Sequence, residues 1–410
     1  MDLILKNARL ADAVRRSTDI GIDDGRIVAI EPDLAAHGET INLRDRLVSS
    51  GFVETHIHLD KSCILDRCTS DRGDIEEAIA EVAKAKKTFT PEDVHARATR
   101  TLEKAILQGT THMRTHLEVD PVVHLRSLEG VLPLIKEYAW AIDLEICVFP
   151  QEGLLNNPGT DALMIEGLNR GCRVVGAAPY TDSNPAGQID RVFEMAHEFD
   201  VDIDMHLDFG PTADAMDVDH VCRRTDQYKY GGRVAIGHVT KATSLPIHKF
   251  AAMAKRLAGA GVALTVLPAT DLFLMGRHHK HDHNSTRGVL PAHKLIDQGV
   301  NCSLASNNVL NPFTPFGDCS LMRMANLYAN IGQVGTRTHM AACFDMITRR
   351  PAQLMRLHDY GIAIGNTADL VVLDATEPEM AVAELAPVLY AFKRGRRTFT
   401  REPAQLHRPK

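Results

Sequence analysis

Short apolar runs alternate with longer amphipathic stretches through most of the chain. Eight of these runs are rich in β-branched residues and fit strands, at residues 47–60, 111–119, 144–153, 173–180, 202–209, 233–240, 262–270 and 301–309. Between them, stretches such as PEDVHARATRTLEKAILQG and PAGQIDRVFEMAHEFD place apolar residues three to four positions apart, with Pro or Asp near their starts. Eight strand-then-helix units predict an α/β fold, a parallel (β/α)8 TIM-like barrel.

A doubly wound parallel sheet is the competing architecture for this pattern. It is disfavoured because neither a GxGxxG run nor a Walker-type loop follows any early strand. In a barrel, the functional side chains are expected at the carboxyl ends of the strands.

The two ends of the chain carry a different pattern, with short alternating runs separated by glycine turns. LILKNARLAD and DIGIDDGRIVAIEPDL surround a hairpin signal at Asp23-Asp24-Gly25. Near the other end, YGIAIGNTADLVVLD and LYAFKRGRRTFT have the same character. We expect residues 1–48 and 360–410 to build one small β-sandwich domain together, with the barrel inserted at residues 49–359.

Composition narrows the class of partner. Charged residues make up 24% of the 410 and hydrophobic residues 44%, which is ordinary globular usage and excludes a disordered chain. The net charge is −7 and the basic residues are dispersed, so we expect no nucleic acid and no anionic membrane as partner. A small molecule is the expected partner, and a homo-oligomer is possible.

The sequence carries no sign of export. No stretch approaches the roughly 20 apolar residues of a membrane span, and the first residues lack a basic region followed by an apolar core. The eight cysteines are scattered, with no CxxC pair, as expected of reduced buried thiols. These features predict a cytoplasmic protein.

Histidines close three of the expected strands. The first strand ends at His56-Ile57-His58, and residues two apart in a strand face the same side, so both rings can enter the barrel mouth. Single histidines close the fifth strand, at His206, and the sixth, at His238. Imidazoles that meet at the carboxyl ends of parallel strands indicate a site for a divalent transition metal.

Several motifs carry a resemblance to a known family. HIHLDKS, GTTHMRTHLEVDP, VFPQEGLL, VVGAAPY, IDMHLDFG, GHVT, GRHHKHDHNSTRGVLP and YGIAIGNTADLVVLD resemble the metal-dependent amidohydrolase superfamily, in its cytosine deaminase-like branch. HLDKS, DVDIDMH and NPFTPFG are also similar to the triazine-degrading N-isopropylammelide amidohydrolases. The resemblance covers almost the whole chain and implies a (β/α)8 barrel with a small β-sandwich and one Zn or Fe ion.

The resemblance also implies roles for individual residues. His56, His58 and His206 would ligate the metal, His238 would hydrogen-bond the metal-bound water, and Gln151 would meet a ring amide of the substrate. Relatives with two metals usually bridge them with a carboxylated lysine at the end of strand 4. Here that strand ends GAAPYTDSN, without lysine, so one metal is the better interpretation.

Two departures from the family pattern affect proton transfer. Alignment on NPFTPFG places Asn307 where the family has an aspartate that ligates the metal and takes a proton from the water. An amide cannot be a general base, although its oxygen can still coordinate weakly, so Asn307 stays with His238 in the candidate catalytic set. Phe209 stands where cytosine deaminases carry a glutamate that moves protons to the ring.

Three explanations of these departures stay open. Another group could serve as base, namely His238, Asp208, Asp60 or a member of the histidine cluster at residues 278–283. Alternatively, an activated heterocycle with a good leaving group could need less help from a base. The third possibility is a non-catalytic relative that binds a ligand or assembles with partners.

Further residues near the expected strand ends could bind substrate, or could instead form ion pairs that only stabilise the fold. Lys61 could reach a substrate carbonyl or pair with Asp60. His116, with Arg114 on the same strand, could touch substrate or belong to a buried ion pair. Asn308, next to Asn307, completes this set. The HHKHDH run is more typical of a solvated loop than of a second metal site.

The working prediction is metal-assisted hydrolysis of a C–N bond in a pyrimidine- or triazine-like heterocycle. The alternative is a non-catalytic binding or assembly protein with the same fold.

Overall fold

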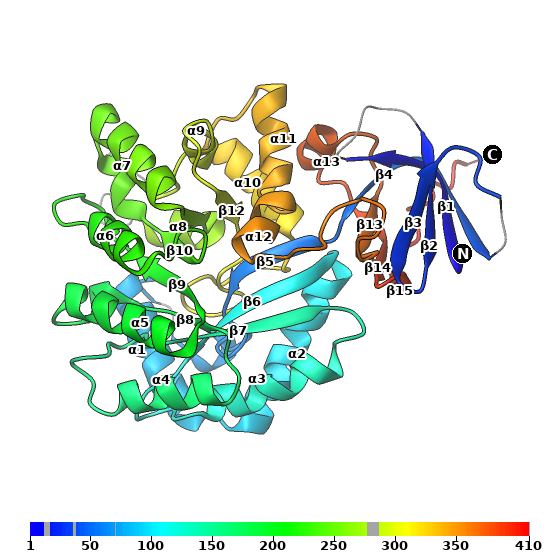
Figure 1. Cartoon of the computed structure of the whole chain (residues 1–410). Coiled ribbons are helices and arrows are strands. Elements are labelled where there is room, and N and C mark those ends of the chain that lie inside the picture. The colour runs from blue at the N-terminus through cyan, green and yellow to red at the C-terminus, as the bar shows by residue number, and fades with distance from the viewer. Residues whose placement is uncertain (12–16, 36–37, 70, 277–286, 410) are drawn as a thin grey trace.

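The computed structural model describes the chain except for residues 12–16, 36–37, 70, 277–286 and 410. Its larger sheet has eight parallel strands that follow one another in sequence order around a barrel (Figure 1). The strands are β5 (Phe52–Ile57), β6 (Thr110–Glu118), β7 (Asp143–Phe149), β8 (Val174–Val175), β9 (Asp202–Leu207), β10 (Val234–His238), β11 (Val262–Val266) and β12 (Cys302–Leu304). The predicted barrel is confirmed.

Backbone hydrogen bonds close the barrel between its first and last strands. The Asn307 N–H donates to the His56 carbonyl (2.8 Å), and the His58 N–H donates to the Asn307 carbonyl (2.9 Å). These two bonds hold the chain after β12 against the end of β5. They therefore fix Asn307 beside the His56-Ile57-His58 segment.

Helices surround the barrel (Figure 1). The predicted stretches begin at side-chain caps: Thr90 accepts from the Asp93 N–H, and Asn184 accepts from the Gly187 N–H. Each cap is followed by a proline, which suits the first turn of a helix. The helices are α1 (Ile75–Ala85), α2 (Pro91–Leu107), α3 (Arg126–Glu137), α4 (Thr160–Asn169), α5 (Pro185–Phe199), α6 (Val218–Tyr228), α7 (Ile247–Ala260), α8 (Pro268–Leu274), α9 (Ala292–Ile296), α10 (Leu321–Ile331), α11 (Arg337–Asp345), α12 (Arg349–Leu354) and α13 (Pro378–Glu384).

The strand predicted at residues 47–60 was wrong in its extent, because two strands share that run. β4 (Glu39–Ser50) belongs to the smaller sheet, and β5 begins at Phe52 in the barrel. Gly51 lies between them, where a Cβ atom would come within 2.2 Å of the Thr111 side chain. The apolar run therefore continues through a change of sheet that hydrophobicity alone does not show.

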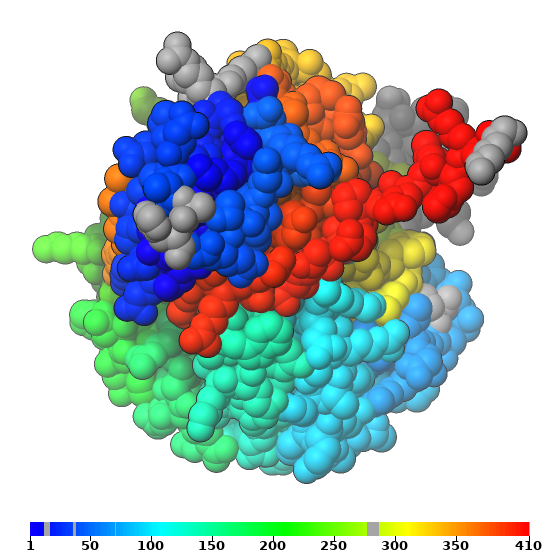
Figure 2. Space-filling model, turned by 90° about the vertical axis from the view of Figure 1, so that its right-hand side faces the viewer, coloured from blue at the N-terminus to red at the C-terminus, as the bar shows by residue number. Residues whose placement is uncertain are grey.

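The smaller sheet is built from both ends of the chain. Its order is β15-β14-β13-β4-β1-β2-β3, with β1 and β4 parallel and the other neighbours antiparallel. The remaining bounds are β1 (Leu3–Leu10), β2 (Thr18–Asp23), β3 (Arg26–Glu31), β13 (Leu370–Leu373), β14 (Val388–Lys393) and β15 (Arg396–Thr400). Figure 2 shows the two terminal regions packed side by side. The hairpin at Asp23-Asp24-Gly25 is confirmed, whereas the domain limits at residues 48 and 360 stay predictions.

A buried lysine joins the smaller sheet to the amino ends of two barrel strands. The Lys393 ammonium, at the end of β14, donates to Asp369 (2.6 Å) and Asp143 (2.7 Å). It also donates to the Thr111 carbonyl (3.1 Å) and lies 3.4 Å from His112 Nε2. We call Lys393, His112, Asp143 and Asp369 the junction cluster.

The cysteine prediction agrees with the structure. All eight cysteines are free thiols, and seven of them are buried. In the part of the chain that the structure describes, none of the helices combines the length and the apolar character of a membrane span.

Candidate functional site

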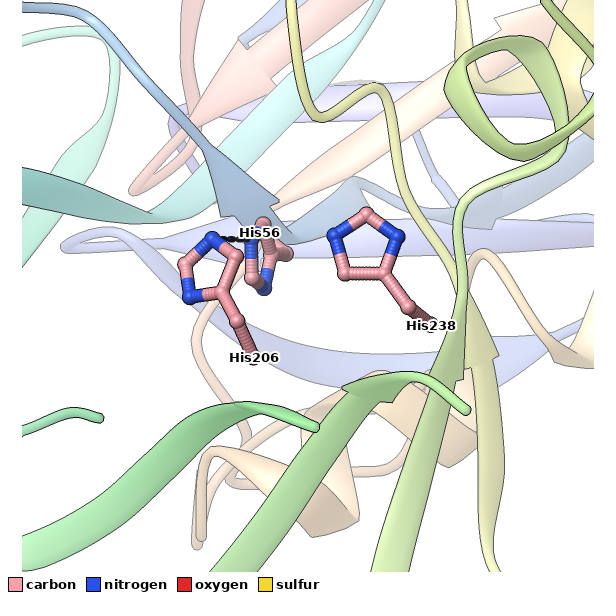
Figure 3. Close-up of side chains that lie close together, drawn as sticks. All are labelled: His56, His206 and His238. Atoms are coloured by element: carbon pink, nitrogen blue, oxygen red, sulfur yellow. Dashed lines mark hydrogen bonds between the residues drawn. The ribbon is translucent and has the colours of Figure 1, made fainter. Parts of the chain in front are cut away.

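Three imidazoles converge at the carboxyl ends of β5 and β9. His206 Nε2 lies 3.0 Å from His56 Nε2 and 3.0 Å from His58 Nε2. A ring nitrogen of His238, at the end of β10, also belongs to a group with His56 and His206 whose ligand atoms all lie within 4.8 Å (Figure 3). We call His56, His58 and His206 the histidine triad.

Two nitrogen separations within the triad suit ligands of a single metal ion. Nitrogens bound at about 2.1 Å to one ion at angles of about 90° to 110° lie roughly 3.0–3.4 Å apart. The two Nε2 separations of 3.0 Å fall in that interval. His56 Nδ1 and His206 Nδ1 are buried without a hydrogen-bond partner. The triad therefore has the donor chemistry of a transition-metal site, and two of its three nitrogen separations are short enough for ligands of one ion.

Burial keeps the triad neutral. Desolvation, with the nearby His116 ring, lowers the pKa of His56 to about 3. Desolvation, with the Lys61 charge near His58 and the neighbouring imidazoles near His206, likewise holds the pKa values of both residues well below the usual range. A neutral imidazole is the form that binds a metal, so at neutral pH the triad needs no deprotonation.

A charged layer lies beneath the triad. Arg114 is fully buried and donates to Asp204 (2.9 Å) and Glu145 (2.8 Å). Burial acts to raise the pKa of Asp204, but the surrounding His116 and Arg114 groups outweigh it and hold that pKa well below its usual range. Of the two interpretations of Arg114, the buried ion pair is the one observed.

His116 belongs to this lower layer. Its ring stacks on His56 at a centroid distance of 3.8 Å, and its Nε2 lies 3.5 Å from Asp204 Oδ1. It is fully buried and does not line the cavity above the triad. The predicted substrate contact of His116 therefore finds no support in this geometry, which instead places its ring against a triad member.

The cavity above the triad combines polar and aromatic walls. Seven predicted or singled-out positions besides His58 line it: Lys61, Gln151, His206, Phe209, His238, Asn307 and Asn308. Sequence reasoning missed the other lining residues, which are Ile75, Tyr180, Thr270, Leu274 and Phe313. These come from loops and helices whose side-chain directions strand periodicity does not define.

Lys61 lines the cavity but does not pair with Asp60 through its side chain. Its ammonium contacts Glu118 and donates to Gln151 Oε1 (2.9 Å). Asp60 instead accepts from the backbone N–H groups of Lys61 and Glu118, each at 2.9 Å. The predicted pairing of Lys61 with Asp60 is therefore wrong, and the acidic partner of the Lys61 ammonium is Glu118.

A second buried lysine balances the charge behind Lys61. The Lys86 ammonium donates to Asp120 (2.5 Å), contacts Glu152 and lies 3.4 Å from Glu118. Burial acts to lower the pKa of Lys86, but Glu118 and Asp120 raise it above its usual value. Glu118, Asp120 and Glu152 are thus paired with Lys61 and Lys86. Of the two lysines, Lys61 is the one that lines the cavity.

Asn307 is held in a conformation that presents its side chain to the site. Its backbone has φ 60°, in the left-handed region that Asn tolerates better than most residues. Its Oδ1 is buried without a hydrogen-bond partner, and the residue lines the cavity. An unpaired buried carbonyl oxygen costs free energy unless a ligand satisfies it.

His238 has a carboxylate partner that the sequence analysis missed. His238 Nδ1 lies 2.6 Å from Asp271 Oδ1, and Asp271 is fully buried on α8. The available signal was an aspartate at the end of LTVLPATD, just after the seventh strand. Its pairing with His238 spans 33 positions of sequence, which no local pattern reveals.

The other proposed bases do not line the cavity. Burial raises the pKa of Asp60 and that of Asp208 to about 6 in each case. The Asp208 carboxylate accepts hydrogen bonds from the backbone N–H groups of Asp217 and Val218. The Asp60 carboxylate accepts them from the backbone N–H groups of Lys61 and Glu118. The cluster at residues 278–283 lies outside the described residues. Among the described candidates, His238 is the one that faces the cavity.

Comparisons with known proteins agree with this geometry. The N-isopropylammelide isopropyl amidohydrolase of Pseudomonas sp. (strain ADP) is 29% identical over 96% of each chain. The pterin deaminase of Rhizobium rhizogenes is 28% identical over 87% of this chain and 82% of its own. A crystal structure of 5-methylcytosine deaminase from Klebsiella pneumoniae, liganded with 5-fluorocytosine, superposes with a TM-score of 0.94 at 26% identity and covers 99% of both chains.

The predicted resemblance is confirmed by these relatives. Residues 141–399, more than half of the chain, match the amidohydrolase family. The chain therefore belongs to the amidohydrolase family.

Proposed function

We propose that this hydrolase cleaves a C–N bond of a small nitrogen heterocycle, using one divalent transition metal held by His56, His58 and His206. The convergence of the three Nε2 atoms beside the cavity carries the proposal. The relatives support the substrate class, because their names concern a triazine, a pterin and a methylated cytosine.

The metal would be Zn or Fe, which both accept imidazole ligands. When bound, it would lower the pKa of a water molecule toward neutrality and polarise the carbon under attack. Asn307 Oδ1 is the further oxygen donor available beside the triad. A carbonyl oxygen brings no charge, so it would stabilise the ion less than a carboxylate does.

The cavity walls suit a flat polar ring. Gln151 and Asn308 offer amides that can donate to and accept from ring nitrogens and carbonyls, and Lys61 offers a positive donor. Phe209, Tyr180 and Phe313 supply aromatic surface.

Metal stoichiometry on protein purified without a His tag or chelator is the first test. About one equivalent of transition metal, with hydrolysis in a panel of pyrimidines, triazines and pterins, is the expected result. No metal after reconstitution, together with intact folding by circular dichroism, would contradict the proposal. That result would favour the non-catalytic alternative, which a binding assay with the same panel would then examine.

A further inference from the structure

We propose that Asp271 is a positioning residue that fixes the tautomer of His238, so that His238 Nε2 takes the proton of the attacking water. The inference rests on the proposed hydrolase function and identifies the group that replaces the carboxylate absent at Asn307.

The geometry of the pair is specific. His238 Nδ1 lies 2.6 Å from Asp271 Oδ1, and Asp271 Oδ2 accepts from the Leu267 N–H at 3.3 Å. Both carboxylate oxygens are thus occupied, and the side chain is fully buried. Figure 3 shows one ring nitrogen of His238 turned toward His56 and the other turned away.

An ionised Asp271 can only accept hydrogen bonds, so beside this carboxylate the proton of a neutral His238 lies on Nδ1. Nε2 then carries a free lone pair on the side of the ring that faces the histidine triad. The Phe209 ring packs edge-on against His238, with centroids 5.1 Å apart and planes at 84°. This contact and the Asp271 hydrogen bond together restrict rotation of the imidazole.

His238 is the candidate base that lines the cavity outside the triad. The described residues that line it include no Asp or Glu, and Lys61 already donates to Gln151 while its ammonium contacts Glu118. In the proposed step, the water oxygen bonds to the ring carbon while its proton moves to His238 Nε2. The C–N bond then breaks, and that proton leaves with the amine nitrogen. Atoms and charge balance without a further reactant.

The informative substitution is Asp271→Asn. The amide cannot serve both neighbours: if its oxygen accepts from the Leu267 N–H, its NH2 group faces His238 Nδ1. That arrangement favours the tautomer with the proton on Nε2, which cannot act as a base. We expect kcat to fall by about 10²- to 10⁴-fold, with little change in KM.

The tautomer provides a readout that does not depend on turnover. Long-range ¹H–¹⁵N spectra of metal-free protein, with His238 assigned through His238→Gln, should show the Nδ1–H form in the unaltered chain and its loss in Asp271→Asn. The matched control is Asp19→Asn, which also removes a buried carboxylate that accepts from two backbone N–H groups, but in the smaller sheet. Asp19→Asn should leave the His238 signal and kcat as they are.

A double variant keeps the test decisive if Asp271→Asn loses stability. If Asp271 acts through His238, then Asp271→Asn added to His238→Gln should reduce kcat by less than about threefold further. A full additional loss, or an unchanged His238 tautomer in Asp271→Asn, would overturn the inference. Failure of the proposed function has a different signature: absence of metal and turnover in the unaltered chain, with the tautomer result unaffected.

Discussion

Two clusters of histidine and other polar groups lie at opposite ends of the barrel strands and differ in how their polar atoms are paired. In the junction cluster, ligand atoms of His112, Asp143 and Asp369 lie within 4.8 Å of one another, as do those of His56, His206 and His238 at the other end. However, the Lys393 ammonium already donates to both aspartates of the junction cluster. In the triad, by contrast, ring nitrogens of His56 and His206 have no partner.

The difference shows how to separate a structural cluster from a functional one. Proximity of donor atoms is common to both, so it does not discriminate. An internal cation satisfies the two aspartates of the junction cluster, whereas two triad members, His58 and His206, line a cavity that a ligand can enter. This contrast predicts that substitutions in the triad affect chemistry and those in the junction cluster affect stability.

The largest effect is expected from His206→Ala. Removing a nitrogen that lies 3.0 Å from both other triad members should abolish metal binding and lower turnover by about 10⁴-fold or more, equivalent to about 5 kcal/mol. Metal analysis and steady-state kinetics measure both quantities. The control is His95→Ala, a histidine on α2 outside the site, which should keep one equivalent of metal. Retention of metal by His206→Ala would contradict the assignment.

Lys393→Met, in the junction cluster, should lower stability and leave turnover unchanged, in contrast to His206→Ala. It removes the buried cation beside Asp369, which costs about 3–5 kcal/mol of the free energy of unfolding, whereas the partly exposed Asp143 keeps its ion pair with Arg394 at 2.6 Å. Urea denaturation measures this loss, while kcat per folded molecule should stay within twofold. A large loss of kcat in folded protein would remove the distinction between the two clusters.

The junction cluster should also make stability depend on pH. Burial, with the Lys393 charge, lowers the pKa of His112 to about 4 from 6.5. Between these values the unfolded chain binds a proton that the folded chain does not, so stability falls as the pH decreases, by about 3 kcal/mol over the window. His112→Gln should flatten this dependence in denaturation experiments at pH 4 to 7. An identical slope in the variant would exclude His112 as its source.

The smallest effect is expected from Asn307→Asp, which tests whether residue 307 contributes to metal binding at the triad. The added charge beside the triad should tighten metal affinity by about tenfold to a hundredfold, measured by competition with a chelator. Asn308→Asp is the matched control, since Asn308 also lines the cavity but already accepts from Asn311 at 2.7 Å. Equal tightening in both variants would indicate a general electrostatic effect instead of coordination by residue 307.

Much of the site was predictable because it depends on local rules. Strand periodicity gave both rings of the His56-Ile57-His58 segment one direction, and parallel topology brought His206 and His238 to the same end. The pairing of Asp271 with His238 and of Lys61 with Glu118 was not predictable, because each joins side chains far apart in sequence. The change of sheet at Gly51 was missed because an apolar run looks the same in both sheets.

The order of strands in the smaller sheet also bears on synthesis of the protein. β4 lies between β1 and β13, and the 319 residues from 51 to 369 separate β4 from β13 in the chain. At about 5–20 residues per second, a ribosome needs on the order of tens of seconds to supply β13. During that interval β4 has an unpaired edge, which is a template for association with other chains. The yield of soluble protein should therefore depend on the rate of translation through the barrel.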